Sequence, residues 1–96
     1  MLVLITYDVN TQTAQGVRRL NKVAKVCTNY GQRVQNSVFE CIVDSTQLAM
    51  VKKQIADIID IEQDSVRYYV LGEKYQNRVE HVGKNRGVDM TGILIC

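Results

Sequence analysis

An aspartate near the start of the chain is the first candidate for chemistry. Asp8 follows a run of strand-forming residues and precedes Asn10 and Thr11, a pair suited to capping a helix. It is therefore expected where a strand becomes a loop at the rim of a sheet, where folds commonly place functional groups. A carboxylate there can hold Mg²⁺ or Mn²⁺, ions that activate water for hydrolysis of a phosphodiester. The alternative is a turn aspartate without chemistry.

One carboxylate supplies too few ligands for such a metal site. A two-fold axis near Asp8 would resolve this, because an isologous homodimer presents the same residue from both protomers to one shared ion. Two facing aspartates also repel each other, so we expect the pair to separate when no metal is bound.

A cluster of basic residues is the second candidate site. Every charged residue between positions 9 and 39 is basic: Arg18, Arg19, Lys22, Lys25 and Arg33. Arg18, Lys22 and Lys25 align on one helical face, with Arg19 at its flank. Such a ridge can neutralise a phosphate backbone without reading its sequence. An ordinary solvated helix face is the alternative, although surfaces that serve only solubility usually mix both signs of charge.

Acidic residues gather later in the chain. They are Asp57, Asp60, Glu62 and Asp64. Acids near the C-terminus of a helix oppose its macrodipole, so they are not expected to stabilise the helix. Solubility and repulsion of nucleic acid are the two expected roles.

Other sources of chemistry are weaker. No G-x-S-x-G motif or glycine-rich phosphate loop occurs, and the single histidine, His81, has no nucleophile signature beside it. Tyr7 and Phe39 could stack on bases, although aromatic residues within strands more often belong to the core. The three cysteines lack a C-x-x-C pair, which favours reduced, buried thiols over a disulfide framework or zinc. They are Cys27, Cys41 and Cys96.

Six elements are expected to position these side chains. The periodicity predicts strands over residues 2–9, within 32–43 on both sides of a turn at Asn36-Ser37, and over 65–71. It predicts helices over 13–30 and from a capping box at Asp44 and Gln47 to Asp60. The order β-α-β-β-α-β predicts an α+β, ferredoxin-like fold with both helices on one face of an antiparallel sheet.

The 96 residues are expected to form one domain, with a core over 1–72 and a tail over 73–96. Two weaker β segments in the tail are Arg78–Val82 and Gly92–Cys96. We expect one of them to pair with the sheet of a second protomer, because a small sheet exposes its edge. With no apolar run approaching the roughly 18 residues of a membrane span, we expect a cytoplasmic protein without membrane contact.

Two stretches carry a resemblance to a known family. Tyr7-Asp8-Val9, followed by GQRVQNSVFE from Gly31 to Glu40, resembles the small CRISPR-associated (Cas) adaptation protein family. Members of this family are the second of the two universal spacer-acquisition subunits and the partners of the Cas integrase. The resemblance covers nearly the whole chain, and the tail segment Val79–Gly83 is most similar to members from subtype I-C systems. It implies a ferredoxin-like homodimer with its last strand paired across the dimer.

The resemblance also implies an activity and roles for single residues. It implies a Mg²⁺-dependent nuclease, acting on single-stranded RNA in some members and on double-stranded DNA in others. Asp8 matches the metal-binding aspartate, and Tyr7, Arg33 and Phe39 fall on motif positions associated with activity. In the integration complex, two integrase dimers flank one central dimer, whose basic surface contacts the duplex. Some members act there without using their nuclease site.

The leading hypothesis is a DNA-bridging subunit of the integration complex with metal-dependent cleavage centred on Asp8. One alternative is a structural adaptor in which Asp8 does no chemistry. Another is a stand-alone ribonuclease of the toxin type. A regulatory module for small molecules shares this fold class, but the basic stretch gives no reason to prefer it.

Overall fold

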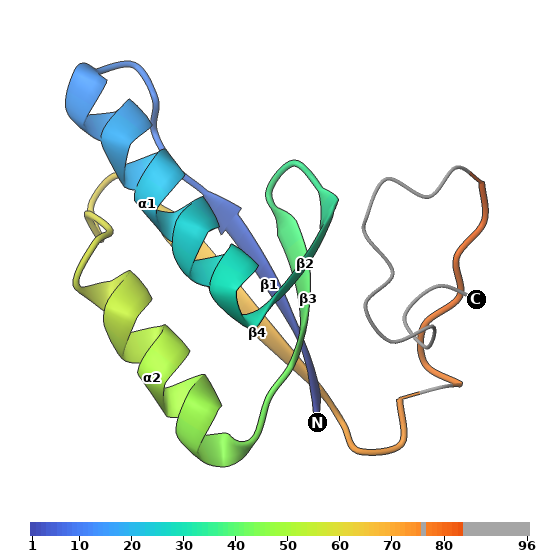
Figure 1. Ribbon diagram of the computed structural model, residues 1–96. Helices are drawn as coiled ribbons and strands as arrows, with labels where there is room; N and C mark the ends of the chain where they lie inside the picture. Colours follow the sequence, from blue (N-terminus) through green and yellow to red (C-terminus); the bar gives the residue numbers. More distant parts are fainter. Residues whose placement is uncertain (76, 84–96) are drawn as a thin grey trace.

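A four-stranded sheet covered on one face by two helices forms the body of the protein. The structure is a computed structural model that describes residues 1–75 and 77–83. Its elements are β1 (Leu2–Asp8), α1 (Ala14–Tyr30), β2 (Gly31–Gln35), β3 (Val38–Ile42), α2 (Ser45–Ala56) and β4 (Ser65–Gly72). The strands are antiparallel in the order β2-β3-β1-β4, and both helices lie on one side of them (Figure 1). The predicted α+β, ferredoxin-like fold is confirmed.

Helix α1 begins within one residue of its predicted start at Thr13, and the Asn10-Thr11 pair does not cap it. Its N-cap is Thr13, whose Oγ1 accepts a hydrogen bond from the backbone N–H of Gly16 at 3.1 Å. The side chain of Asn10 instead accepts from the N–H of Gln12 at 3.0 Å, which folds the connecting loop. Gly16 is buried because the loop crosses the first turn, and a Cβ there would clash with the Asn10 carbonyl.

Helix α2 starts as predicted and ends early. Asp44 Oδ1 accepts from the Gln47 N–H at 2.7 Å, and Gln47 Oε1 accepts from the Asp44 N–H at 3.0 Å, which confirms the capping box. The helix ends at Ala56, short of the predicted end at Asp60. The reason is that the Asp60 N–H donates to the carboxylate of Asp64, four residues ahead, at 2.9 Å. No helix in the described ranges is long and apolar enough to cross a membrane.

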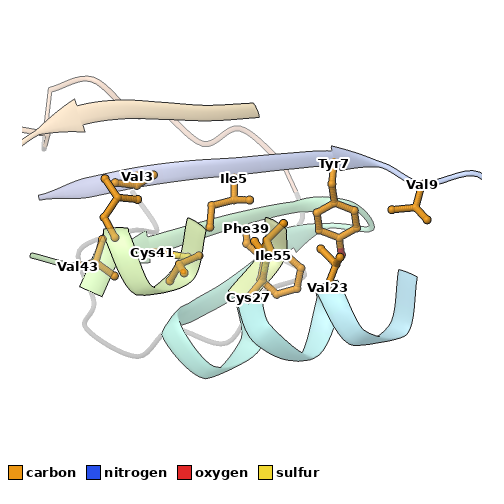
Figure 2. Packing of buried hydrophobic residues seen from close by; sticks show 12 residues of the cluster. Val3, Ile5, Tyr7, Val9, Val23, Cys27, Phe39, Cys41, Val43 and Ile55 are labelled. Atoms are coloured by element: carbon orange, nitrogen blue, oxygen red, sulfur yellow. The ribbon is translucent and has the colours of Figure 1, made fainter. Parts of the chain in front are cut away.

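The core lies between the sheet and the helices. Val3, Ile5 and Tyr7 alternate along β1 and point toward the helices, as Figure 2 shows. Cys27 and Cys41 are buried free thiols, and burial raises the pKa of Cys27 to about 12 and that of Cys41 to about 11. Both therefore stay protonated near neutral pH, as the prediction of reduced, buried thiols requires; Cys96 lies outside the described residues.

In the described part of the tail, Tyr75 packs on the sheet. Gly72 has a φ of 83°, a conformation that favours glycine, and it turns the chain away from β4. Beyond it, Tyr75 packs on the fully buried Leu2, with partly buried Leu71 and Val79 beside them. Residues 78–82 form no strand of the sheet described here, and their predicted pairing with the sheet of a second protomer stays a prediction. The second predicted segment, Gly92–Cys96, lies outside the described residues.

The joint between α1 and β2 gives a test of the fold. Gly31 lies opposite Cys41, and a Cβ there would clash with the Glu40 carbonyl and come within 2.6 Å of the Cys41 sulfur. We expect Gly31→Ala to lower the free energy of unfolding by roughly 1–3 kcal/mol, because backbone atoms of the ladder cannot easily move aside. Urea denaturation followed by circular dichroism measures this.

Gln35→Ala is the matched control for Gly31→Ala, since Gln35 is exposed in the same strand. It should change stability by less than about 0.5 kcal/mol. A Gly31→Ala protein as stable as the wild type would contradict the close approach of β2 and β3.

Candidate metal and nucleic-acid sites

Asp8 lies on the face of the sheet that carries no helix. It is the last residue of β1, and it is exposed, whereas its neighbour Tyr7 is buried under α1. In the sheet it lies opposite Ser65, the first residue of β4. Among the described residues, no hydrogen bond or ion pair engages its carboxylate. The predicted position of Asp8, at the end of the first strand, is confirmed.

The surroundings of Asp8 meet the needs of a divalent cation only in part. Mg²⁺ is typically held by one or two carboxylates together with several waters. An exposed carboxylate without a partner is a suitable oxygen ligand. However, no group of three or more His, Cys, Asp or Glu side chains gathers anywhere in 1–75 and 77–83. A set of three such ligands that includes Asp8 would have to draw on residues outside these ranges or on a second chain, as the two-fold hypothesis proposes.

The side chain of Arg67 lies on the same face of the sheet as Asp8. Arg67 lies two residues after Ser65 in β4 and opposite Thr6, so its side chain leaves the sheet on the same side as Asp8. It is exposed, and its Nη1 donates to the Tyr69 hydroxyl at 3.3 Å. In the sequence, the alternation of residues in SVRYYVL (65–71) indicates that Arg67 lies on the same face of its strand as Ser65. Only the register between β1 and β4 shows that this is also the face of Asp8.

The other motif residues lie together on the opposite face. The rings of Tyr7 and Phe39 stack with centroids 6.1 Å apart and an interplanar angle of 23°. The Arg33 guanidinium carbon sits 5.2 Å from the centroid of the Phe39 ring, because the two residues are paired between β2 and β3. The structure therefore brings Tyr7, Phe39 and Arg33 into one stack and separates them from Asp8.

Burial decides what the two aromatic residues of this stack can do. Phe39 is fully buried and Tyr7 nearly so, while Arg33 is exposed. Burial also raises the pKa of the Tyr7 phenol, whose hydroxyl donates to the Asn36 carbonyl at 3.4 Å. Their role is that of core residues, and the surface that this stack offers to a ligand is the guanidinium of Arg33.

The predicted basic ridge is present on α1. Arg18, Lys22 and Lys25 are all exposed on this helix, at the spacing that aligns them on one face. None of the three makes an ion pair within the part of the chain that the structure describes. These cations are therefore free to meet a phosphate backbone.

Arg19 differs from the rest of the basic cluster because it pairs with a buried acid. Its Nε donates to Asp64 Oδ2 at 2.8 Å, and its Nη2 donates to Oδ1 at 3.3 Å. The Asp64 side chain is fully buried and also accepts from the N–H groups of Asn10 and Asp60. Through these bonds the pKa of Asp64 lies below its ordinary value, with Arg19 as the main cause.

The expectation that Asp64 serves solubility or repels nucleic acid is therefore wrong. Its carboxylate joins the β1–α1 loop, α1 and the α2–β4 loop at the end of the sheet where Asp8 lies. The two partners lie 45 residues apart in the chain, so no local spacing could indicate the pair.

Comparison with known proteins gives consistent results. The family model described as "CRISPR associated protein Cas2" matches residues 1–79. A protein of Halalkalibacterium halodurans named "CRISPR-associated endonuclease Cas2" is 59% identical over 95 residues, 99% of each chain. One of Chlorobaculum tepidum named "CRISPR-associated endoribonuclease Cas2" is 53% identical over 95 residues, again 99% of each chain. A crystal structure of Streptococcus pyogenes Cas2 at pH 6.5 superposes with a TM-score of 0.76 at 54% identity, covering 86% of this chain and 100% of the other.

The Arg19–Asp64 pair gives a pH-dependent prediction. An aspartate with a lowered pKa stabilises the folded protein above its unfolded pKa, near 3.8, and this stabilisation is lost as the pH falls through the lowered value. We expect Asp64→Asn to reduce the free energy of unfolding by roughly 2–3 kcal/mol at pH 7, because charge-assisted hydrogen bonds are lost. The difference should shrink below the ordinary pKa of an aspartate.

Urea unfolding at several pH values between 7 and 3 measures this difference. Glu62→Gln is the matched control, since it removes a nearby exposed carboxylate. A difference between Asp64→Asn and the wild type that stays constant over this range would show that the charge of Asp64 does not stabilise the fold.

Proposed function

Because this chain belongs to the CRISPR associated protein Cas2 family, we propose that it binds duplex DNA and bridges integrase dimers during spacer acquisition. We further propose a metal-dependent cleavage of phosphodiester bonds in DNA or single-stranded RNA, in the cytoplasm of a cell with a subtype I-C system. The names of its relatives, an endonuclease and an endoribonuclease, support the nuclease part. The observation that carries the proposed chemistry is the exposed carboxylate of Asp8 at the end of β1, which makes no hydrogen bond or ion pair within the described residues.

In the proposed cleavage site, the two Asp8 side chains of the homodimer together hold one shared Mg²⁺. Mn²⁺ could replace this ion. When bound, such an ion lowers the pKa of a coordinated water and polarises a phosphoryl oxygen. The contribution of this chain is to place the carboxylate at the end of β1, exposed on the face without helices. Arg67, on the same face, would stabilise negative charge that develops on the scissile phosphate.

The proposed homodimer uses the face that carries Asp8. Ile42 and Tyr69 are large and exposed, and Ile42 lies opposite Leu2 and Tyr69 opposite Leu4, so all leave the sheet on this face. Gln32 lies on the same face, buried, and neither polar atom of its amide has a hydrogen-bond partner among the described residues. Buried amides are rarely left unpaired, which supports a further contact at this face. In this proposal, residues 1–72 form the core of each protomer and 73–96 the tail that pairs across the dimer.

The proposed DNA surface is the basic ridge Arg18, Lys22 and Lys25, with Arg33 beyond it. Arg19 is the flank of this surface, although its bonds to Asp64 leave its guanidinium less available for phosphate. Contacts of this kind bind the duplex through its charge, which suits a protein that must hold DNA of any sequence.

A non-catalytic adaptor is the second candidate function. The observation in its favour is that the described residues of one chain offer a cation no cluster of three suitable side chains. In this case the ridge would hold DNA, and Asp8 would serve only as the end of β1.

Asp8→Asn separates these two functions. If Asp8 holds the metal, this change should reduce cleavage by at least about 100-fold, which corresponds to about 2.7 kcal/mol of barrier. The assay uses labelled duplex DNA and single-stranded RNA with Mg²⁺, Mn²⁺ or EDTA, on proteins first shown to be dimeric by light scattering.

The control for this assay is Glu62→Gln, which removes an exposed carboxylate from the α2–β4 loop. Cleavage that survives Asp8→Asn would overturn the proposed site. If the wild type cleaves neither polymer with either metal, the adaptor function is the better explanation.

Lys22→Ala tests the DNA surface. The logarithm of the association constant falls linearly with the logarithm of salt concentration, with a slope close to the number of phosphates contacted. We expect Lys22→Ala to reduce this slope by about one for every duplex sequence. Fluorescence anisotropy measures the association constant at salt concentrations between about 50 and 200 mM, and the slope follows from these values.

The matched control for Lys22→Ala is Lys53→Ala, an exposed lysine on α2. It should leave the slope unchanged. If the Lys22→Ala protein shows the same slope as the wild type, Lys22 does not belong to the DNA surface.

A further inference from the structure

A hollow of about 300 Å³ lies between α1 and the turn that joins β2 to β3. Its apolar part consists of Leu20 and Ala24 on α1, with Tyr7 beneath them. Figure 2 shows Tyr7 extending from β1 toward this helix. The hollow lies on the helix side of the sheet, so the sheet separates it from the carboxylate of Asp8.

Polar residues line the rest of the hollow. They are Asn21 on α1, Arg33 on β2, and Asn36 and Ser37 in the turn. Among the described residues, none of these four side chains makes a hydrogen bond. Two amides, a hydroxyl and a guanidinium therefore converge here with their donors and acceptors free for a ligand.

Arg33 is held in place before any ligand arrives. Its guanidinium lies over the ring of Phe39, which in turn stacks on Tyr7, and both rings belong to the core. A guanidinium whose carbon lies over an aromatic ring can still present its N–H groups to a ligand. That edge can donate two parallel hydrogen bonds to a phosphate, and fixing it beforehand reduces the entropy lost on binding.

The charges around the hollow favour an anion. Arg18 and Lys25 are exposed, and they lie three residues before and four residues after Asn21, on the same side of α1. No acidic residue lines the hollow, and none occurs between positions 9 and 39. A ligand here therefore meets Arg33 in the lining, with Arg18 and Lys25 on the same side of α1, and no carboxylate from this stretch.

The size and lining select one kind of anion. A volume of about 300 Å³ is at the lower end of the range for small-ligand sites, roughly 300–1,000 Å³. It suits one nucleotide and is too small for a base pair. Amide side chains can hydrogen-bond the edge of an unpaired base, and the apolar side of Leu20 and Ala24 can cover a sugar or base face.

We propose that this hollow binds a single unpaired, phosphorylated nucleotide, with its phosphate on Arg33 and its base at Asn21 and Asn36. The inference rests on the proposed nucleic-acid binding and deepens it, because recognition of an unpaired nucleotide then occurs on the face opposite Asp8. The nucleotide can be the unpaired end of a DNA strand or a free mononucleotide. Both sources present the same chemistry.

The test is a titration of the full-length protein with three probes. They are adenosine 5′-monophosphate, inorganic phosphate, and a duplex with an unpaired 3′ overhang compared with the same duplex made blunt. Nuclear magnetic resonance follows the side-chain amide signals of Asn21 and Asn36, and anisotropy follows the duplexes. The wild type should bind the monophosphate more tightly than phosphate, with shifts at both amides, and should prefer the overhang by about tenfold.

Two variants test the lining. Arg33→Gln removes the phosphate partner, and Asn21→Leu places an apolar side chain at an exposed position that should not disturb folding. Each should weaken binding of the monophosphate by about tenfold or more. Lys53→Ala, on α2 and not among the residues that line the hollow, should bind every probe as the wild type does.

The outcomes separate this inference from the proposed function. Equal binding of phosphate and monophosphate, or no shift at either amide, would overturn the nucleotide site even if the blunt duplex binds well. Specific monophosphate binding without duplex binding would support the site and contradict the DNA-bridging function. A preference for the overhang identifies the strand end as the source, whereas monophosphate binding without that preference identifies a free nucleotide.

Discussion

The alternation of side chains along β1 is the constraint on which the rest of this structure depends. Because successive residues of a strand point to opposite faces, Tyr7 enters the core beneath α1 while Asp8 faces away from both helices. Neighbours in the sequence therefore belong to two different surfaces. One surface offers a carboxylate, an arginine and exposed apolar residues, and the other offers cations and amides around a hollow.

A buried ion pair holds the end of the sheet at which these surfaces diverge. Asp64 accepts four hydrogen bonds, two from Arg19 and one each from the backbone at Asn10 and Asp60. A buried carboxylate is tolerated when its lone pairs are satisfied in this way. The same bonds end α2 before Asp60 and fix the loop that follows Asp8, so one side chain sets the geometry of three segments.

The sheet places the motif residues on two opposite faces. Residues that motif comparison groups as one set, Asp8 with Tyr7, Arg33 and Phe39, do not form one site in a single chain. Tyr7 and Phe39 support Arg33 from the core, and Arg33 is the member of the stack that reaches solvent. Asp8 instead lies on the open face. Exposed Ile42 and Tyr69 accompany it there, together with the Gln32 amide, which has no partner in the part of the chain that the structure describes.

The sequence by itself determined the order of elements, the capping box at Asp44, the end of β1 at Asp8 and the basic face of α1, because local periodicity and capping carry this information. Only the tertiary structure decided which of these residues meet. The bond between Arg19 and Asp64 spans 45 residues, and Arg67 comes near Asp8 through the register of β1 with β4. Pairing between distant segments depends on packing and register, which no local pattern encodes.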